Sequence, residues 1–265
     1  MTHRPTFRPL NKATPKGREW WTFEALAAKN GANISIMDTI GAWGVQAAPL
    51  VEAIGQLEAE ATINLHICSP GGDVFEGNEI FNALKAHKGQ INVTIGAICA
   101  SIATMIACSG DTVTMAKNGL YMIHNVSGYT YGDAKAHRRN ADVIDKLSKG
   151  IIDVYAGKSQ QPPDVLETMM AEETWMTSAE AVDKGFVDSV DEDEDDAEVV
   201  NRFELGQFRN CAAAIAKLSK LTRKPAPPAP APRPQASRIP ARWNPNQSTL
   251  ANDYRAGKLR IFATK

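Results

Sequence analysis

The sequence has few of the features that mark membrane, secreted or metal-binding proteins. No apolar run approaches the roughly 18–20 residues that a bilayer-spanning helix needs. Met1–Arg8 contain no apolar core of a secretory signal. The four cysteines are spaced neither like a disulfide framework nor like a zinc site. We therefore expect a cytoplasmic protein with reduced thiols and with no metal, cofactor or membrane contact.

Acidic side chains are scarce in the C-terminal part of the chain. Residues 199–265 contain 13 Lys and Arg but only 2 Asp and Glu, although the whole chain has a net charge of −1. A basic segment on an acidic body favours electrostatic docking, either to a partner or to the body itself. The alternative is a solvated tail that its charge keeps soluble.

Patterns between about residues 30 and 190 predict an α/β domain. Apolar residues make up 43% of the chain and charged residues 22%, which is ordinary for a globular protein. Strand-like and helix-like patterns alternate, and this favours the α/β class. We expect strands over 32–37, 62–68, 91–95, 112–115, 120–123 and 186–190. We expect helices over 49–57, 74–87, 102–108, 132–155 and 162–170, and one more that begins with a capping box at Thr177 and Glu180.

Composition divides the chain into five predicted parts. A basic arm over residues 1–30 precedes the domain over 31–190. The acidic run that follows cannot pack, so 191–198 is predicted to be a linker. A helix is predicted over 199–224. Residues 225–265 hold 8 of the chain's 15 prolines, all before position 246, and this predicts a flexible, basic, proline-rich tail.

Ser101 is the candidate nucleophile. It lies in the stretch Ala97-Ile-Cys-Ala-Ser101, at the junction of a strand and an apolar helix, between small residues that let a substrate carbonyl approach. At a helix N-terminus, the free N–H of the next residue, Ile102, can face a developing negative charge. The alternative is that Ser101 only caps the helix, which is the commoner role of a junction serine.

Among the five histidines, His124 is the best candidate for a general base. It ends the apolar strand Leu120–Ile123 and opens into a polar loop, where an imidazole can be held firmly and still reach a cleft. A purely structural histidine is the alternative. The other four have less suitable surroundings, at His3, His66, His87 and His137.

The turn Ser69-Pro-Gly-Gly72 is the third candidate element. Neither Gly71 nor Gly72 carries a Cβ, so the backbone can come close to a ligand and offer it an N–H. A plain tight turn is the alternative. A phosphate-binding loop is disfavoured, because no Gly-x-Gly-x-x-Gly or Walker pattern surrounds the turn.

These elements together resemble the proteolytic subunit of Clp proteases. The order is Ser69-Pro-Gly-Gly72 before a helix, Ala100-Ser101 before an apolar helix, Met122-Ile-His124, and the closing stretch Trp175–Val190. The resemblance runs from about Ala32 to Val190 and implies a ClpP/crotonase-like α/β fold of repeated strand-strand-helix units. Two motifs resemble the phage and prophage head-maturation branch, namely Gly41-Ala-Trp-Gly44 and Glu172-Glu-Thr-Trp175.

The resemblance implies a Ser–His–acid triad. Ser101 and His124 fall on the nucleophile and the base, and alignment back from Glu180-Ala-Val places Glu173 at the acid. Glutamate is one methylene longer than the usual aspartate, so the backbone of Glu173 must lie slightly farther from the imidazole that it orients. The other candidates for the acid are Glu172, Asp142 and Asp133.

The resemblance also implies an oxyanion hole. The N–H groups of Gly72 and Ile102 are the donors, and Gly71 makes the turn. Ala97 departs from the family, which usually has glycine near the start of the nucleophile motif.

The function implied is serine endopeptidase activity on capsid or scaffold proteins during phage head maturation, in the host cytoplasm or the prohead. By the same resemblance we expect a homo-oligomeric ring, with the 132–155 helix between subunits; the alternative is that this helix is core. No ATP-binding motif lies in the chain, so an ATPase partner would be a separate protein.

The other functions considered are a general Clp subunit working with an ATPase, a crotonase-type acyl-CoA enzyme, and a non-catalytic capsid assembly protein whose basic tail contacts nucleic acid.

Overall fold

The computed structural model describes residues 21–26, 31–191, 205–213 and 215–216. These all belong to one compact unit, Met1–Arg223, and a second unit comprises Lys224–Lys265. The predictions for residues 1–20, for 192–198 of the acidic linker and for the tail over 225–265 lie outside the described residues.

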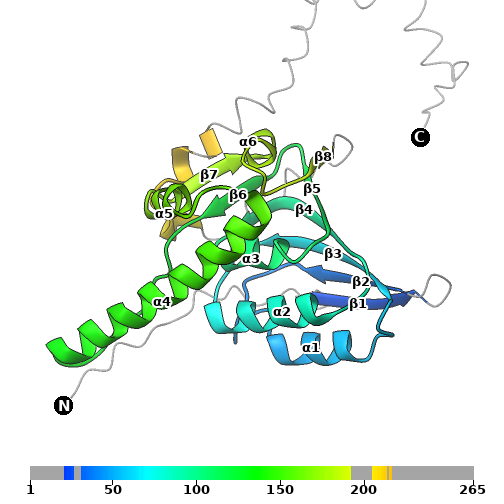
Figure 1. The fold of residues 1–265 in the computed structure, drawn as a ribbon, viewed down its shortest axis with the longest axis horizontal. Coiled ribbons are helices and arrows are strands. Elements are labelled where there is room, and N and C mark those ends of the chain that lie inside the picture. Colours follow the sequence, from blue (N-terminus) through cyan, green and yellow to red (C-terminus); the bar gives the residue numbers. More distant parts are fainter. Residues whose placement is uncertain (1–20, 27–30, 192–204, 214, 217–265) are drawn as a thin grey trace, which may run out of the picture. The chain divides into compact units, whose positions relative to one another are not determined.

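The described residues form one mixed sheet of eight strands with six α-helices (Figure 1). The strands are β1 (Trp21–Leu26), β2 (Gly31–Ile36), β3 (Thr62–Ser69), β4 (Ile91–Ala100), β5 (Thr112–Ala116), β6 (Leu120–Ile123), β7 (Thr174–Thr177) and β8 (Ser189–Asp191). The helices are α1 (Ala47–Gly55), α2 (Val74–Ala86), α3 (Ile102–Ala107), α4 (Ala134–Ser159), α5 (Pro163–Ala171) and α6 (Ser178–Asp183). The predicted alternation of strands and helices is confirmed.

Two strands were not predicted. The first, β1, lies within the predicted N-terminal arm and pairs antiparallel with β2 at the edge of the sheet. Its residues Trp21-Thr-Phe-Glu-Ala do alternate apolar and polar side chains, and Trp21 and Phe23 are half-buried against the main core, so the prediction missed a strand that the pattern indicates. The second, β7, pairs antiparallel with β6 and has only four residues, Thr174–Thr177. Thr177 then caps α6 with Glu180 in the predicted capping box.

Strand β4 changes its partner along its length. Asn92–Ile95 pair with β5, and Ile98–Ala100 pair with β6, both in parallel. The predicted strand ended at Ile95, whereas the observed strand continues to Ala100. The pairing of the second half of β4 with β6 brings the residues that follow β4 close to those that follow β6.

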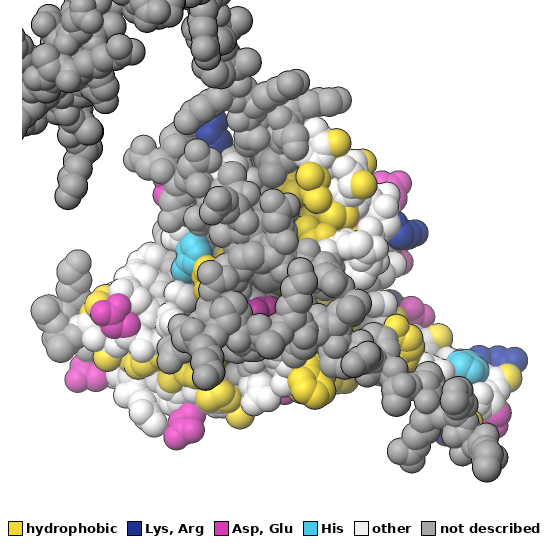
Figure 2. Space-filling view, turned by 180° about the vertical axis from the view of Figure 1, so that it is seen from behind, with side chains coloured by type: hydrophobic (Ala, Val, Ile, Leu, Met, Phe, Trp, Pro, Cys, Tyr) yellow, Lys and Arg dark blue, Asp and Glu magenta, His cyan; other side chains and the backbone are white. Residues whose placement is uncertain are grey.

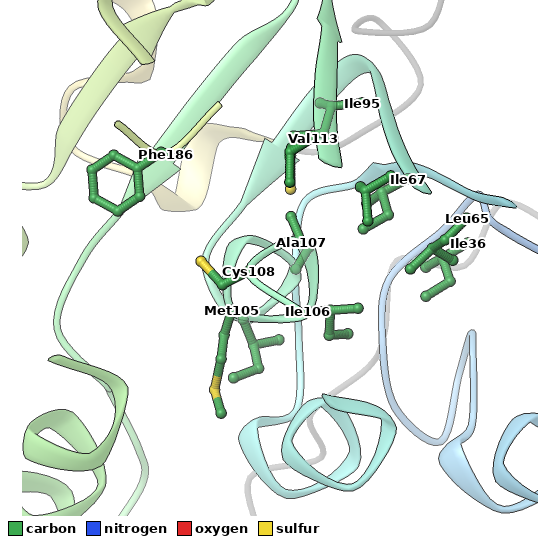
Figure 3. Close-up of a cluster of buried hydrophobic side chains, with 14 of the residues drawn as sticks. Ile36, Leu65, Ile67, Ile95, Met105, Ile106, Ala107, Cys108, Val113 and Phe186 are labelled. Atoms are coloured by element: carbon green, nitrogen blue, oxygen red, sulfur yellow. The ribbon is translucent and has the colours of Figure 1, made fainter. Parts of the chain in front are cut away.

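The main core lies between the sheet and the helices. Figure 3 shows Met105, Ile106 and Ala107 of α3 among side chains of the strands and Phe186. Because α3 is buried on all sides, its sequence is apolar throughout, as a helix enclosed by other elements requires.

Helix α4 is long, and only its C-terminal turns are buried. Its buried residues are Ile151, Ile152, Tyr155 and Ser159. The rest of the helix extends away from the sheet (Figure 1), and Val143 is 47% exposed. The alternative that this helix is simply core is therefore wrong for its N-terminal half.

Of the predicted helix over 199–224, residues 211–213 and 215–216 are helical, residues 205–210 are not α-helical, and residues 199–204, 214 and 217–224 lie outside the described residues. A 3-10 turn, η2 (Leu205–Gln207), is followed by a turn at Arg209 and Asn210, and helical backbone resumes only at Cys211. In a continuous α-helix the N–H groups of Arg209 and Asn210 would bond to carbonyls four residues earlier. They donate instead to the carboxylate of Glu173, so the helix is interrupted there.

None of the described helices has the length and apolarity needed to cross a bilayer. All four cysteines are buried within the described residues, and no disulfide joins them. On the face shown in Figure 2, the described Lys and Arg side chains are scattered and do not gather into one patch.

Candidate active site

Strand pairing brings Ser101 and His124 together. Ala100, the last residue of β4, pairs with Met122 of β6, and the N–H of Ser101 donates to the carbonyl of Met122 at 2.9 Å. Parallel strands end at the same edge of a sheet, so the residues after them are neighbours. The Nε2 atom of His124 lies 2.8 Å from the Oγ atom of Ser101, within hydrogen-bond distance.

The backbone of Ser101 has an unusual conformation. Its φ of 57° and ψ of −133° are rare for a residue with a Cβ. Ser101 occupies the N-cap position of α3, yet its side chain forms no capping hydrogen bond. The alternative role as a helix cap is therefore wrong, and the hydroxyl is directed to His124 instead. A serine on a sharp strand-to-helix turn is the geometry of the nucleophile elbow in α/β-hydrolases.

The Gly71–Gly72 turn lies against this serine. A Cβ on Gly71 would come within 2.6 Å of the Ser101 Cβ and of the Ala100 carbonyl oxygen, and a Cβ on Gly72 would meet the Ile40 carbonyl oxygen at 2.0 Å. The turn is held by Ser69, whose Oγ accepts from the Gly71 N–H at 3.1 Å. Glycine is required at both positions, because their φ angles are 90° and 150° and the space is closed.

The N–H groups of Gly72 and Ile102 are available at this site. Neither donates a hydrogen bond to another group of the described chain. Both residues line one small cavity with Ser101 and His124, and the other lining residues are Val74, Val126, Ser127, Ile151 and Tyr155. Two such donors beside a serine hydroxyl are the arrangement that stabilises a carbonyl oxygen as it becomes negatively charged.

Glu173 is placed next to His124 by the pairing of β6 with β7. Ile123 pairs with Thr174, so the residues just outside this pair, His124 and Glu173, are adjacent. Glu173 has a φ of 54°, and its side chain is buried, with 6% of the residue exposed. Among the described residues, no hydrogen bond joins its carboxylate to His124.

The Glu173 carboxylate accepts three hydrogen bonds from other groups. Oε1 accepts from the Trp175 indole N–H at 3.1 Å and from the Asn210 N–H at 2.7 Å. Oε2 accepts from the Arg209 N–H at 2.9 Å. This environment suits an ionised carboxylate, since each donor stabilises the charged form.

The other predicted candidates for the acid lie elsewhere. Asp133 caps α4 by accepting from the Ala136 N–H at 2.8 Å. Asp142 is exposed on α4, and the side chain of Glu172 is exposed as well. Of the four candidates, the structure places only Glu173 beside His124.

Burial and nearby charges set the pKa values of the two groups. Burial lowers the pKa of His124 below its ordinary 6.5, the negative charge of Glu173 raises it, and the positive charge of Arg209 lowers it again. For Glu173, burial raises the pKa, but the hydrogen bonds from Asn210, Arg209 and Trp175 and the charge of His124 bring it below the ordinary value. At neutral pH the imidazole is therefore uncharged and the carboxylate is ionised, as base and acid of a triad require.

Four residues at this site were not predicted. Trp175, Phe208, Arg209 and Asn210 contact Glu173 or His124. Trp175 was noted only as part of a motif, and the other three lie in a segment that was predicted to be a helix. The one signal in the sequence is the three-residue spacing of Leu205, Phe208 and Cys211, all of which are buried.

Comparison with known proteins places the chain in a family. Residues 33–194 match the Clp protease family, which is more than half of the chain, and the chain belongs to this family. It is 29% identical over 135 residues to "ATP-dependent Clp protease proteolytic subunit 2" of Parasynechococcus marenigrum (strain WH8102), covering 50% of this chain and 68% of that relative. Members of this family are serine peptidases that form homo-oligomeric rings and act on polypeptides. The predicted resemblance to Clp proteolytic subunits and the predicted α/β fold are thereby confirmed.

Proposed function

We propose that this chain is a serine endopeptidase in which Ser101 is the nucleophile, His124 the general base and Glu173 the triad acid. The observation that carries the proposal is the 2.8 Å separation of the Ser101 Oγ and the His124 Nε2. The strained backbone of Ser101 and the glycine turn beside it support the same assignment.

The proposed reaction is acyl transfer. His124 takes the proton of the Ser101 hydroxyl as the oxygen attacks the carbonyl carbon of a peptide bond. The carbonyl oxygen becomes negatively charged and accepts hydrogen bonds from the N–H groups of Gly72 and Ile102. His124 then gives its proton to the leaving amine, and water hydrolyses the acyl-enzyme by the same steps. Gly71 contributes by shaping the turn that presents the Gly72 N–H.

Labelling with a fluorophosphonate tests the nucleophile. The probe is expected to modify one peptide, the one that contains Ser101, and Ser101→Ala should abolish both labelling and the cleavage of fluorescein-labelled casein. Ser127→Ala is the matched control, because Ser127 lines the same cavity and is not bonded to His124. Labelling that persists in Ser101→Ala would show that another residue is the nucleophile.

We also propose that the substrate is a capsid or scaffold protein of a phage. This finer role is supported by the resemblance of the motifs Gly41-Ala-Trp-Gly44 and Glu172-Glu-Thr-Trp175 to the phage and prophage head-maturation branch. An enzyme that processes assembling proteins without a dedicated unfoldase should cleave unfolded casein with no ATPase present. A strict need for an ATPase would favour a general Clp subunit.

We propose that the enzyme works as a homo-oligomeric ring. The support is the projecting N-terminal half of α4 with Val143 exposed, which gives an apolar side chain on a surface that the described chain does not cover. Light scattering of the full chain should give a multiple of the 28.7 kDa chain mass. A monomer alone at micromolar concentration would contradict the ring.

A further inference from the structure

The segment Leu205–Cys211 packs directly behind the candidate catalytic residues. It lies beyond residues 33–194, which match the Clp protease family. Its contacts reach two of the three proposed triad residues, Glu173 and His124.

Three apolar side chains anchor the segment. Leu205, Phe208 and Cys211 are 5%, 9% and 5% exposed. They form a second hydrophobic cluster with residues of the strands that carry the site, on a surface apart from the main core; the strand residues are Cys68, Ala97, Ile98, Ala100 and Met122. The segment is thus held to the strands β3, β4 and β6, which also position the Gly71–Gly72 turn, Ser101 and His124.

The turn of the segment holds the acid. The N–H groups of Arg209 and Asn210 supply two of the three hydrogen bonds to the Glu173 carboxylate. The side chains of the same two residues bond to the backbone just before it: the Arg209 guanidinium donates to the Ala171 carbonyl at 3.1 Å, and the Asn210 amide donates to the Glu172 carbonyl at 2.8 Å. A buried carboxylate without such donors would be costly to keep ionised.

Phe208 contacts the base. Its ring lies edge-on to the His124 imidazole, with centroids 5.6 Å apart, and also edge-on to Trp175 at 5.7 Å. Trp175 in turn donates to Glu173. One aromatic side chain of the segment therefore packs against both the base and a partner of the acid.

We propose that Leu205–Cys211 is a positioning element of the catalytic site. In it, Phe208 packs against the base His124, and the main-chain N–H groups of Arg209 and Asn210 hold the carboxylate of the acid Glu173. This inference rests on the proposed function, because it assigns a role toward Ser101, His124 and Glu173. None of these three groups of the segment lines the cavity beside Ser101, so they act through Glu173 and His124 and not on the substrate.

The test uses single substitutions in the full chain and the rate of fluorophosphonate labelling. Asn210→Pro removes the N–H that bonds to Glu173, whereas Asn210→Ala keeps it and removes only the side chain. We expect Asn210→Pro and Phe208→Ala to slow labelling about 10²-fold, the size of effect that a small misplacement of a catalytic group produces. Asn210→Ala keeps the N–H and loses only the side chain, which bonds to the Glu172 carbonyl, so it should slow labelling clearly less than Asn210→Pro. The exposed control Gln207→Ala should leave the labelling rate unchanged.

A double substitution separates positioning from general structural support. Groups that act through Glu173 have little left to act on in Glu173→Gln, so adding Asn210→Pro there should change the rate by less than about twofold. Thermal unfolding of each variant shows that the domain is folded. If a variant does not fold, Phe208→Leu is measured in its place. This substitution keeps most of the apolar volume of Phe208 and loses the aromatic contact to the His124 imidazole.

Each result decides the matter. Labelling of Asn210→Pro and Phe208→Ala at the unmodified rate would overturn the positioning role and leave the proposed function intact. Faster labelling would also overturn it, because the segment would then restrain the acid. An equal loss in the Glu173→Gln background would mean that the segment acts elsewhere. No labelling of Ser101 in the unmodified chain would overturn the proposed function, and the positioning role with it.

Discussion

The hydroxyl of Tyr155 lies 2.6 Å from the Oγ1 atom of Thr104. Thr104 belongs to the helix that begins after the candidate nucleophile, and its hydroxyl donates to the carbonyl of Ser101. Tyr155 belongs to the buried end of α4. This chain of hydrogen bonds joins the long projecting helix to the backbone of Ser101.

Removal of the Tyr155 hydroxyl should therefore reduce stability. Tyr155→Phe leaves the packing of the ring intact and deprives a buried hydroxyl of its partner, which costs about 1–2 kcal/mol. The unfolding free energy, measured in urea, should fall by this amount. Tyr131→Phe is the control, because Tyr131 is fully exposed, and its stability should not change. Equal stability of the Tyr155 and Tyr131 variants would show that the buried hydrogen bond contributes nothing.

The two glycines Gly72 and Gly150 should respond in opposite ways to alanine. Gly72 has a φ of 150°, and a Cβ there would lie 2.0 Å from the Ile40 carbonyl oxygen. The turn would have to move, and the Gly72 N–H could then no longer donate a hydrogen bond to the oxyanion. Labelling and peptide cleavage should fall by about 10²–10³. Gly150 lies within α4 with nothing near the new methyl group, so Gly150→Ala should raise stability by about 1 kcal/mol and leave activity unchanged. A fully active Gly72→Ala enzyme would remove that N–H from the proposed mechanism.

The pH profile should report His124. The base acts only when neutral, so kcat/KM on a peptide substrate rises with pH through the pKa of His124. Burial holds this pKa below 6.5, so the acid limb of the profile should lie below 6.5. Because the charge of Glu173 raises the pKa and that of Arg209 lowers it, Glu173→Gln should shift the limb to lower pH and Arg209→Ala to higher pH. Shifts in the same direction for both variants would contradict this assignment.

The capping box of α6 offers a test of local stability. The Thr177 Oγ1 accepts from the Glu180 N–H, and the Glu180 carboxylate accepts from the Thr177 N–H at 3.0 Å. Thr177→Ala should lower the unfolding free energy by about 1 kcal/mol. Thr177→Ser keeps a capping hydroxyl and should retain most of this stabilisation. Thermal unfolding of the three proteins measures this, and an undiminished melting temperature for Thr177→Ala would show that the cap is dispensable.

The elements with strong local patterns were predicted correctly. Helix α2 and strand β3 lie within one residue of their expected bounds, because apolar spacing and the glycine turn between them are local properties. The errors occur where tertiary contacts outweigh local preference. The second half of β4 is extended because β6 pairs with it, and the turn at Arg209 and Asn210 interrupts a helix because Glu173 binds their N–H groups.

By itself the sequence determined the α/β class, the junction that carries Ser101, the strand end that carries His124, and the Gly71–Gly72 turn that lets the backbone approach Ser101. Each of these depends on residues that are near neighbours along the chain. Only the tertiary structure decided that Glu173 lies beside His124, because the register of β6 against β7 sets that placement, and that Leu205–Cys211 covers the site from behind. Contacts between residues 36 or 37 positions apart, such as those from Glu173 to Arg209 and Asn210, leave no periodic trace in the sequence.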